Sequence, residues 1–401
     1  MNILFITIVR ITDIEVREIY QDLMRKFRDE GHQVYIVSPR ERRFGEPTAL
    51  TKKHGVQVLG VKTLNMQKSS IIEKGLGMLL IENQFRSAIK KHLSDVRFDL
   101  ILYSTPPITF PKLISELKKK NVGAVSYLLL KDIFPQNAVD LGMMKKSGLR
   151  GLIYFYFRKK EQYLYRISDW IGCMSKANVD FVINHNPDVN PRKVEIAPNS
   201  MEMVEILVEK NFEVLVKYGL PTDKPIFIYG GNLGKPQGIP FLIECLDANK
   251  NRQDCHFVVI GDGVDYKLIE DWYQVTQPQN MSLLKCLPKE DYDRLVNSCD
   301  VGMIFLDYRF TIPNFPSRLI PYMMMKKPIF AATDVNSDLG TIATENGFGE
   351  WCPSNSVEAF TEMVTRLLQA NLKEMGQNAY NYFKANYTTD NTYNAIMAHF
   401  K

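Results

Sequence analysis

The feature that most constrains the fold is an alternation of short apolar runs with amphipathic helical stretches, which occurs twice along the chain. In the first half, apolar runs of strand length occupy residues 2–9, 32–39, 98–105, 124–130 and 170–175. A second series occupies residues 224–231, 255–263, 281–287, 301–307 and 328–333. Apolar runs separated by helices are typical of parallel sheets that are buried on both faces. We therefore predict an α/β protein built from two Rossmann-like domains.

The chain length supports this division, because 401 residues are too many for one hydrophobic core of ordinary size. We place the first domain at residues 1–199 and the second at residues 200–385. Residues 386–401 are expected to form a helix that returns to the first domain, and residues 199–224 are the expected link. Ligands of parallel sheets bind at the carboxyl ends of the strands, so we expect both domains to face a central cleft.

The composition excludes several classes of protein. A net charge of +5 is too small to indicate a nucleic-acid-binding protein. No apolar run approaches the roughly 18 residues that a membrane span needs. The six cysteines show no CxxC pairing and are typical of reduced thiols, so we expect a cytoplasmic protein.

Metal binding is not expected, because the six histidines are scattered and form no cluster at ligand spacing. One acidic triplet, Asp291-Tyr292-Asp293, has the spacing of a metal-binding motif. It lies where a helix is predicted to begin, and acidic side chains suit the positive end of a helix dipole. We therefore interpret the triplet as structural and predict neither a metal nor another cofactor.

The clearest candidate for a ligand-binding loop is IYGGNLGKPQG, residues 228–238, in which a strand runs into four glycines before a helix. Glycine allows the backbone to approach a ligand closely, and the start of a helix offers free N–H groups to an anion. Lys235 adds a full positive charge. The alternative is a tight turn in which the glycines serve only the backbone geometry.

Two further loops follow strands of the same predicted sheet. In VIGDGVDYKLIE, residues 259–270, the glycines repeat the pattern, although Asp262 or Asp265 could instead cap the helix. In TIPNFPSRLIPYMMMKKP, residues 311–328, Ser317 is suited to cap a helix and Arg318 to hold a phosphate with its planar guanidinium. Three such turns on one sheet edge indicate a nucleotide or a phosphorylated donor.

Together these segments resemble glycosyltransferase family 4, and most closely the subgroup that builds bacterial surface polysaccharides. The resemblance covers nearly the whole chain and rests on KDIFPQNAVDLG (131–142), EQYLYRISDWIGCMS (161–175), VEIAPNS (194–200), YGGNLGKPQG (229–238) and FPSRLIPYMMMKKPI (315–329). It implies a GT-B fold and metal-independent, retaining transfer of a hexosyl group from a nucleotide-sugar donor, expected to be a UDP-sugar. The implied acceptor is a polyprenyl-diphosphate-linked glycan at the cytoplasmic face of the membrane, in capsule, O-antigen or exopolysaccharide assembly.

The resemblance also assigns roles to individual residues. Asp132 is the candidate for polarising the acceptor hydroxyl, although an aspartate at this place could simply stabilise the turn. Arg10 and Lys131 are candidates for additional phosphate or acceptor contacts. The expected donor-binding residues are Gly231, Asn232, Gly234, Lys235, Gly261, Asp262, Asn314, Ser317 and Arg318.

The chain departs from the family pattern at several of these positions. The phosphate loop of the family usually carries Arg and Lys where this chain has Asn232 and Gln237, so Lys235 and Arg318 are the nearest replacements for the charge. Two glutamates that usually contact the donor sugar and the ribose are replaced by Pro313 and Pro321. Because proline offers no side-chain acceptor, those contacts must be lost or moved.

Residues 143–167 interleave aromatic and basic side chains in a stretch that is too charged to cross a membrane. Aromatic rings suit the headgroup layer and basic residues suit anionic lipid, so this helix is expected to lie on the membrane surface. The residues expected to face the membrane are Tyr154, Phe155, Phe157, Arg158, Lys159 and Lys160. The alternative is a core helix with a basic solvent face.

Two other functions are compatible with the sequence. The missing glutamates permit a non-catalytic relative that binds the donor as a scaffold. A nucleotide-sugar epimerase with the same two-domain fold is also possible, but the aromatic and basic helix would then have no explanation.

Overall fold

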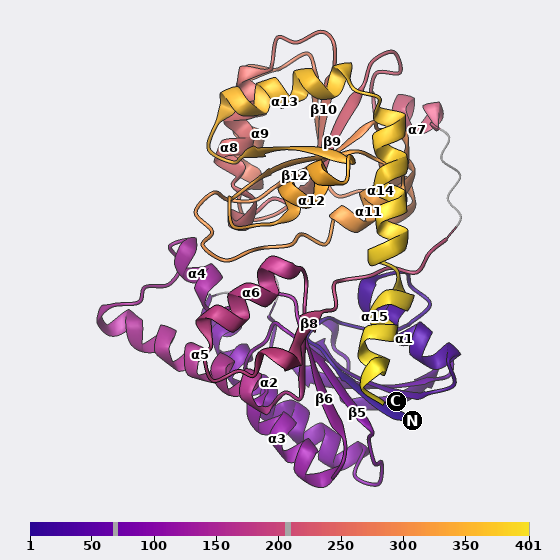
Figure 1. Ribbon diagram of the computed structural model, residues 1–401, viewed down its shortest axis with the longest axis vertical. Coiled ribbons are helices and arrows are strands. Elements are labelled where there is room, and N and C mark those ends of the chain that lie inside the picture. Colours follow the sequence, from indigo (N-terminus) through magenta and orange to yellow (C-terminus); the bar gives the residue numbers. More distant parts are fainter. Residues whose placement is uncertain (67–70, 205–209, 401) are drawn as a thin grey trace. The chain divides into compact units, whose positions relative to one another are not determined.

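The computed structural model describes residues 1–66, 71–204 and 210–400 (Figure 1). The described residues divide into two compact units, and each is an α/β layer structure. The first unit comprises Met1–Glu202 together with Thr388–Lys401, and the second comprises Met203–Tyr387. Within the predicted link, residues 205–209 lie outside the described part of the chain.

In the described residues, the first unit contains an eight-stranded sheet with the order β3-β4-β2-β1-β5-β6-β7-β8. All neighbouring strands are parallel except the antiparallel pair β3 and β4. The strands are β1 (Asn2–Ile6), β2 (Gln33–Glu41), β3 (Ala49–Lys53), β4 (Val56–Thr63), β5 (Leu100–Ser104), β6 (Val125–Leu130), β7 (Trp170–Cys173) and β8 (Val194–Ile196).

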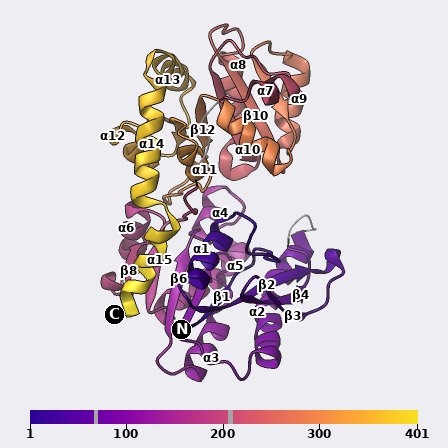
Figure 2. The same cartoon turned by 90° about the vertical axis from the view of Figure 1, so that its right-hand side faces the viewer.

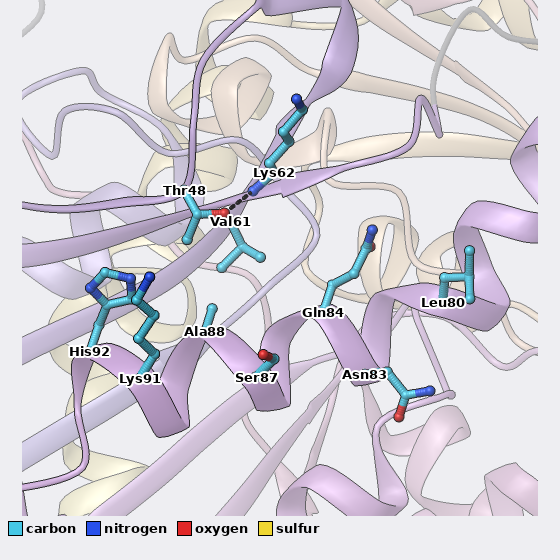
Figure 3. Close-up of a pocket in the computed structure, with 10 residues that line it drawn as sticks. All are labelled: Thr48, Val61, Lys62, Leu80, Asn83, Gln84, Ser87, Ala88, Lys91 and His92. Carbon is cyan, nitrogen blue, oxygen red and sulfur yellow. Dashed lines mark hydrogen bonds between the residues drawn. The ribbon is translucent and has the colours of Figure 1, made fainter.

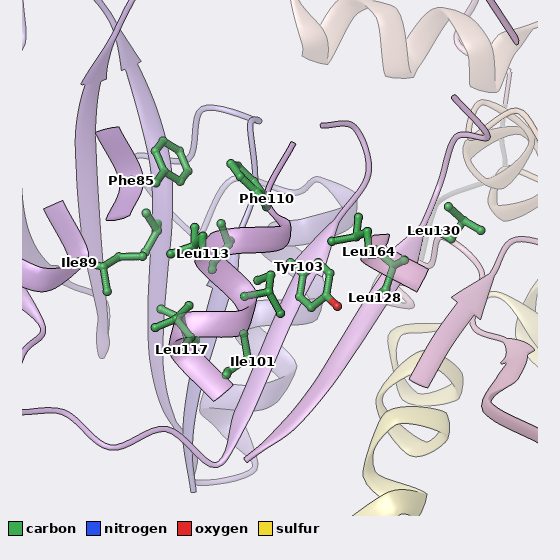
Figure 4. Packing of buried hydrophobic residues seen from close by; sticks show 14 of the residues in the cluster. Phe85, Ile89, Ile101, Tyr103, Phe110, Leu113, Leu117, Leu128, Leu130 and Leu164 are labelled. Atoms are coloured by element: carbon green, nitrogen blue, oxygen red, sulfur yellow. The ribbon is translucent and has the colours of Figure 1, made fainter. Parts of the chain in front are cut away.

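Helices cover both faces of this sheet. The α-helices are α1 (Ile19–Asp29), α2 (Ile71–His92), α3 (Pro111–Lys120), α4 (Gln136–Asp140), α5 (Gly148–Ile167), α6 (Lys176–His185) and α15 (Thr389–Met397). Helices α2, α3, α5 and α6 share one hydrophobic core with the sheet. Figure 4 shows part of this core, with Phe85 of α2, Leu117 of α3 and Leu164 of α5 packed beside β5 and β6.

The opposite face of the first sheet is covered by α1 and α15, which lie side by side (Figures 1 and 2). A capping box begins α15, since Thr388 and Asn391 bond each other's backbone N–H groups. Tyr393 packs edge-on against Phe27 with ring centroids 5.0 Å apart, and Thr392 donates a hydrogen bond to the Pro198 carbonyl. These contacts make the end of the chain part of the first unit.

The second unit contains, in its described residues, a six-stranded parallel sheet with the order β11-β10-β9-β12-β13-β14. Its strands are β9 (Ile226–Asn232), β10 (His256–Asp262), β11 (Met281–Leu284), β12 (Val301–Phe305), β13 (Ile329–Thr333) and β14 (Gly349–Pro353). Its α-helices are α7 (Phe212–Lys217), α8 (Ile239–Ala248), α9 (Tyr266–Thr276), α10 (Lys289–Ser298), α11 (Leu319–Met324), α12 (Leu339–Glu345), α13 (Val357–Gln369) and α14 (Leu372–Asn386).

The predicted fold class is confirmed: two parallel sheets, each flanked by helices, follow one another along the chain. All ten predicted strands are present in the structure, although most are shorter at their ends. The prediction missed β3, β4, β8 and β14. Strand β3 reads ALTKK and lies mostly exposed at the sheet edge, so it lacks the apolar run that marks a buried strand.

None of the helices in the described part of the chain combines the length and the apolar character that a membrane span requires.

Candidate functional site

The three predicted ligand-binding turns lie at the carboxyl ends of adjacent strands in the second sheet. Strand β9 lies between β10 and β12. The ends of β9 and β10 are in register, with Gly231 opposite Gly261 and Asn232 opposite Asp262. The chain after β12 leads into residues 311–318, which precede α11. The structure therefore brings the predicted donor-binding residues together along one sheet edge.

Two of the glycines at this edge are required by contacts within the protein. A Cβ atom on Gly261 would lie 1.9 Å from the Gly231 carbonyl oxygen, and a Cβ atom on Gly230 would lie 2.1 Å from the Tyr292 hydroxyl. Side chains at these positions would therefore overlap with existing atoms. Packing within the protein therefore accounts for glycine at both positions, and Gly230 belongs to the loop for which a purely geometric role was the alternative.

The phosphate-loop segment after β9 forms a short 3₁₀ turn, Lys235–Gln237, before α8 begins at Ile239. Asn232 donates a hydrogen bond from Nδ2 to Oε1 of Gln237, at 2.9 Å. These are the two positions at which the sequence comparison expected positive charge, and here their neutral side chains bond each other. Gly234 is buried, whereas Lys235 is exposed and its amino group is accessible to a ligand.

The aspartates of the second loop do not cap α9. Asp262, the last residue of β10, accepts a hydrogen bond from the backbone N–H of its neighbour Gly263, at 2.9 Å. Asp265 stands at the cap position of α9, but its side chain makes no capping bond. The helix cap considered for these residues is therefore wrong, and the Asp262 carboxylate instead bonds the next backbone N–H.

The segment before α11 differs from its prediction in where the helix begins. Helix α11 starts at Leu319, and Arg318 rather than Ser317 occupies the cap position, with no side-chain cap. The cap predicted for Ser317 is therefore wrong. Pro321 becomes the third helical residue, where the backbone N–H groups have no intrahelical partner, so proline is tolerated there. Its carbonyl still accepts the Met325 N–H, at 3.1 Å.

Two hydrogen-bond donors in this segment are buried without an acceptor. They are Nδ2 of Asn314 and Nη1 of Arg318. Buried polar groups in proteins are nearly always satisfied, so these two donors are available to an acceptor from outside the chain, either a water molecule or a ligand.

Arg318 is the dominant charge at this edge. Its Cζ atom lies 4.6 Å from the centre of the Tyr229 ring, in a cation–π contact. No carboxylate in the described residues forms an ion pair with it, and the groups that act on its charge are tyrosines. A partly buried guanidinium without a counter-charge is costly, and an anion would offset that cost.

In the first unit, Asp132 follows β6 at the carboxyl end of the sheet. No described residue donates a hydrogen bond to its carboxylate, so the alternative role of stabilising the turn through the side chain has no support in the structure. Burial raises the pKa of Asp132 to about 6. The hydroxyl of Tyr20, which is hydrogen-bonded to Ser104, lies within electrostatic range of this carboxylate. A carboxyl with a pKa near neutrality is suited to accept a proton.

Lys131 and Arg10 are both engaged within the first unit. The Lys131 amino group donates a hydrogen bond to the Ala197 carbonyl at 2.9 Å, and burial lowers its pKa to about 7. Arg10 forms an ion pair with Glu46 at 2.5 Å, and its Cζ lies 4.2 Å from the centre of the Phe44 ring. Any contact of these residues with a substrate would compete with these internal partners.

The residues predicted to face a membrane lie on α5, but they do not share one face. Tyr154 is only 9% exposed, and Arg158 bonds Glu161 and the side chain of Asn186. Both side chains therefore point inward, because they belong to the side of α5 that packs on the first sheet. Phe157 is half-buried against Phe134, with ring centroids 5.3 Å apart.

The exposed face of α5 is formed by a different set of side chains. Some of them were not among the residues predicted to face a membrane. Phe155 is 54% exposed as predicted, and Leu152 is 66% exposed. The remaining members are Ile153, Tyr156, Lys159 and Tyr163, with Lys160 at its border. We call Leu152, Ile153, Phe155, Tyr156, Lys159, Lys160 and Tyr163 the α5 face. The signal that the sequence offered was the i, i+3, i+4 spacing of apolar residues, which by itself does not distinguish the buried stripe from the exposed one.

A separate pocket of about 490 Å³ lies in the first unit between α2 and the β3–β4 hairpin (Figure 3). None of the predicted site residues lines it. Figure 3 shows Gln84, Ala88 and Lys91 of α2 on one side and Val61 and Lys62 of β4 on the other.

Among the described residues, no group of three or more His, Cys, Asp or Glu side chains is placed to hold a metal ion. In particular, Asp291 pairs with Lys217 and Asp293 with Lys289.

Comparison with known proteins agrees with this geometry. Residues 211–382 match the family described as Glycosyl transferases group 1. The chain is 24% identical over 327 residues to the probable glycosyltransferase WbjE of Pseudomonas aeruginosa, which covers 80% of this chain and 78% of WbjE.

Solved structures show the same fold over the full length. Sucrose-phosphate synthase of Thermosynechococcus elongatus superposes with a TM-score of 0.77 at 12% identity, over 100% of this chain and 98% of that one. HepE of Anabaena, in complex with UDP and glucose, superposes with a TM-score of 0.66 at 13% identity, over 100% and 99% of the two chains. The chain thus has two Rossmann-like domains of the GT-B type, and residues 211–382 of its second unit match the group 1 glycosyltransferases.

Proposed function

We propose that this glycosyltransferase moves a hexosyl group from a nucleoside-diphosphate donor, a UDP-sugar, to a lipid-linked glycan acceptor in the assembly of a surface polysaccharide. The match of residues 211–382 to group 1 glycosyltransferases supports the reaction class. UDP in the HepE complex supports the donor class, and the similarity to the probable glycosyltransferase WbjE supports a transferase. The acceptor class comes from the family that the sequence motifs resemble.

The observation that carries the proposal is the orphaned cation at the carboxyl edge of the second sheet. Arg318 has no carboxylate partner in the described residues, and Asn314 in the same segment has a buried amide without an acceptor. A diphosphate supplies both the negative charge and the acceptor oxygens that these groups lack. Lys235, exposed at the end of the phosphate loop, adds a second positive charge near the same edge.

In the proposed reaction, the bond between the anomeric carbon and the diphosphate oxygen breaks while a bond to the acceptor oxygen forms. The guanidinium of Arg318 stabilises the negative charge that develops on the leaving diphosphate. Asp132 accepts the proton of the acceptor hydroxyl, for which its unpaired carboxylate and raised pKa are suited.

The acceptor side of the proposal rests on α5. Its exposed face places Leu152, Ile153 and Phe155 beside Lys159, a combination that suits the interface of an anionic bilayer. Phe157 on the inner side of the same helix packs against Phe134, two residues after Asp132. We propose that α5 lies on the cytoplasmic face of the membrane and holds the Asp132 turn close to lipid-linked substrates.

A thermal-shift screen of the full chain tests the donor assignment. We expect UDP and UDP-sugars to raise the melting temperature, because a ligand at about 100 times its Kd stabilises the folded state by about 2.7 kcal/mol. Release of UDP should then require a polyprenyl-diphosphate-linked glycan. No shift with any nucleoside diphosphate would contradict the proposal, whereas binding without release across a panel of such acceptors would favour a non-catalytic scaffold.

Liposome flotation tests the membrane assignment. Replacing Leu152 and Phe155 by Ser on the exposed face of α5 should weaken binding to anionic vesicles by about tenfold, because each exposed apolar side chain loses its transfer into the interface. A matched variant with Lys267 and Lys373 replaced by Ser changes exposed residues of the second unit and should float like the parent. Equal flotation of the α5 variant and the parent would show that the exposed face of α5 does not bind the membrane.

A further inference from the structure

The Arg318 guanidinium lies against Gly231, where a Cβ atom would be 3.2 Å from Cζ, and three tyrosines from three different elements gather at residues 229 and 230 of the same strand end. They are Tyr229 of β9, Tyr292 of α10 and Tyr322 of α11, and all three act on the charge of Arg318. Tyr229 is fully buried and provides the ring beneath the guanidinium. We call these three residues the tyrosine box.

Hydrogen bonds and a glycine fix the box in place. The Tyr322 hydroxyl accepts the Gly230 N–H at 3.0 Å and donates to the Ile228 carbonyl at 3.3 Å, which ties α11 to β9. Tyr292 lies on the same residue, because its hydroxyl occupies the space that a side chain on residue 230 would need. Gly230 is therefore the position that admits Tyr292 to the site.

The box holds the cation without neutralising it. Burial raises the pKa of Tyr229, of Tyr292 and of Tyr322 above the ordinary value for a phenol, and the Arg318 charge only partly opposes this. All three side chains remain neutral at physiological pH. Neutral rings orient a guanidinium through its contact with their faces while leaving its charge available to an anion.

The placement of Tyr292 follows from its acidic neighbour Asp291. Asp291 bonds the Lys217 amino group at 2.7 Å and the Tyr218 hydroxyl at 2.6 Å, both in or next to α7. Asp293 bonds Lys289 one turn earlier on α10, at 3.0 Å. The bonds of Asp291 therefore tie α10 to α7, in the rotation that directs Tyr292 toward Gly230, whereas the bond of Asp293 stays within α10. The central residue of the acidic triplet thus lies against the loop that follows β9.

We propose that Tyr292 is a positioning residue of the donor site, which holds Arg318 in the orientation that binds the diphosphate. This inference rests on the proposed function, because it assumes that Arg318 contacts the donor. Tyr292 itself need not touch the donor, and it acts through the tyrosine box.

Calorimetric titration of the full chain with UDP tests the inference. Tyr292→Leu should weaken UDP binding by about tenfold, and Tyr292→Phe, which keeps the ring and loses the hydroxyl that packs against Gly230, by about threefold. Tyr273→Phe is the matched control, since this phenol on α9 bonds the Met281 carbonyl at the other end of the sheet. That control should bind UDP like the parent.

A double variant separates positioning from general damage to the fold. If Tyr292 acts through Arg318, adding Tyr292→Leu to Arg318→Ala should cause no further loss of UDP affinity. A further tenfold loss in the double variant, or parent-like UDP binding by Tyr292→Leu, would overturn the inference. These results differ from a failure of the proposed function, in which the parent chain itself binds neither UDP nor pyrophosphate.

Discussion

The carboxyl edges of the two sheets have the same architecture but opposite chemistry. At the edge of the second sheet, a cation, Arg318, has no carboxylate partner among the described residues. At the edge of the first sheet, a carboxylate, Asp132, has no hydrogen-bond donor in the described chain, and burial raises its pKa to about 6. One edge is suited to bind an anion and the other to accept a proton.

The neighbours of these two residues sharpen the contrast. In the first unit, the two basic residues considered for substrate contacts are already engaged: Lys131 bonds a carbonyl and Arg10 bonds Glu46. Around Arg318, the neighbouring side chains are neutral phenols. Parallel sheets of one fold class thus acquire different functions from a few side chains in the turns, while the strands and helices serve to hold those turns in place.

The largest effect is expected from removing the unpaired cation. Arg318→Ala should lower kcat/KM by about 10²- to 10³-fold, the range found when one group that stabilises developing negative charge is lost. Arg318→Lys should recover only part of this loss, because an ammonium keeps the charge without the planar fork. Steady-state kinetics with a UDP-sugar measures both variants, with Lys267→Ala as a surface control. Turnover of Arg318→Ala at the parental rate would show that the anion site lies elsewhere.

The unpaired carboxylate should give the next largest effect, and one that depends on pH. Asp132→Asn should lower kcat by about 10²-fold, because general-base assistance is lost while the shape of the side chain is kept. In the parent, kcat should fall as the pH drops below about 6, since protonation removes the base. This acidic limb should be absent from the pH profile of the variant, and UDP affinity should not change. Activity within a few-fold of the parent would remove Asp132 from the mechanism.

The smallest effect concerns the basic neighbour of Asp132. The pKa of Lys131 is lowered to about 7 in the folded state, so between pH 7 and the ordinary lysine pKa the unfolded chain binds more protons. The free energy of unfolding should therefore gain a contribution that rises with pH across this window. Urea unfolding of Lys131→Met should show a smaller rise between pH 7 and pH 9 than the parent. Identical pH dependence would mean that the Lys131 amino group is solvated.

Much of the fold could be predicted from the sequence, because buried parallel strands carry a strong local signal. The runs that became β1, β5, β9 and β12 are almost continuously apolar. The β3–β4 hairpin could not be predicted in the same way, since β3 lies at an exposed edge and carries Lys52 and Lys53. The start of α11 was misplaced because Ser317 has the properties of a cap, yet the helix begins two residues later.

The candidate site was only partly within reach of sequence reasoning. The glycine turns and Arg318 were identified, because their residue types limit what the backbone and the side chain can do. The sequence gives no sign that Tyr292 lies near the site, because its contact with Gly230 joins residues 62 positions apart and depends on the rotation of α10. Likewise, the buried stripe and the exposed face of α5 share similar residue types, and only packing against the sheet separates Tyr154 from Phe155.

The central claim is that Arg318 makes the edge of the second sheet a diphosphate site. Calorimetric titration of the parent and of Arg318→Ala with UDP and with uridine tests it most directly. The account predicts that the parent binds UDP much more tightly than uridine, and that Arg318→Ala loses most of this preference, because the diphosphate supplies the counter-charge that Arg318 lacks. Equal affinity of the parent for UDP and uridine, or an unchanged preference in Arg318→Ala, would contradict the account.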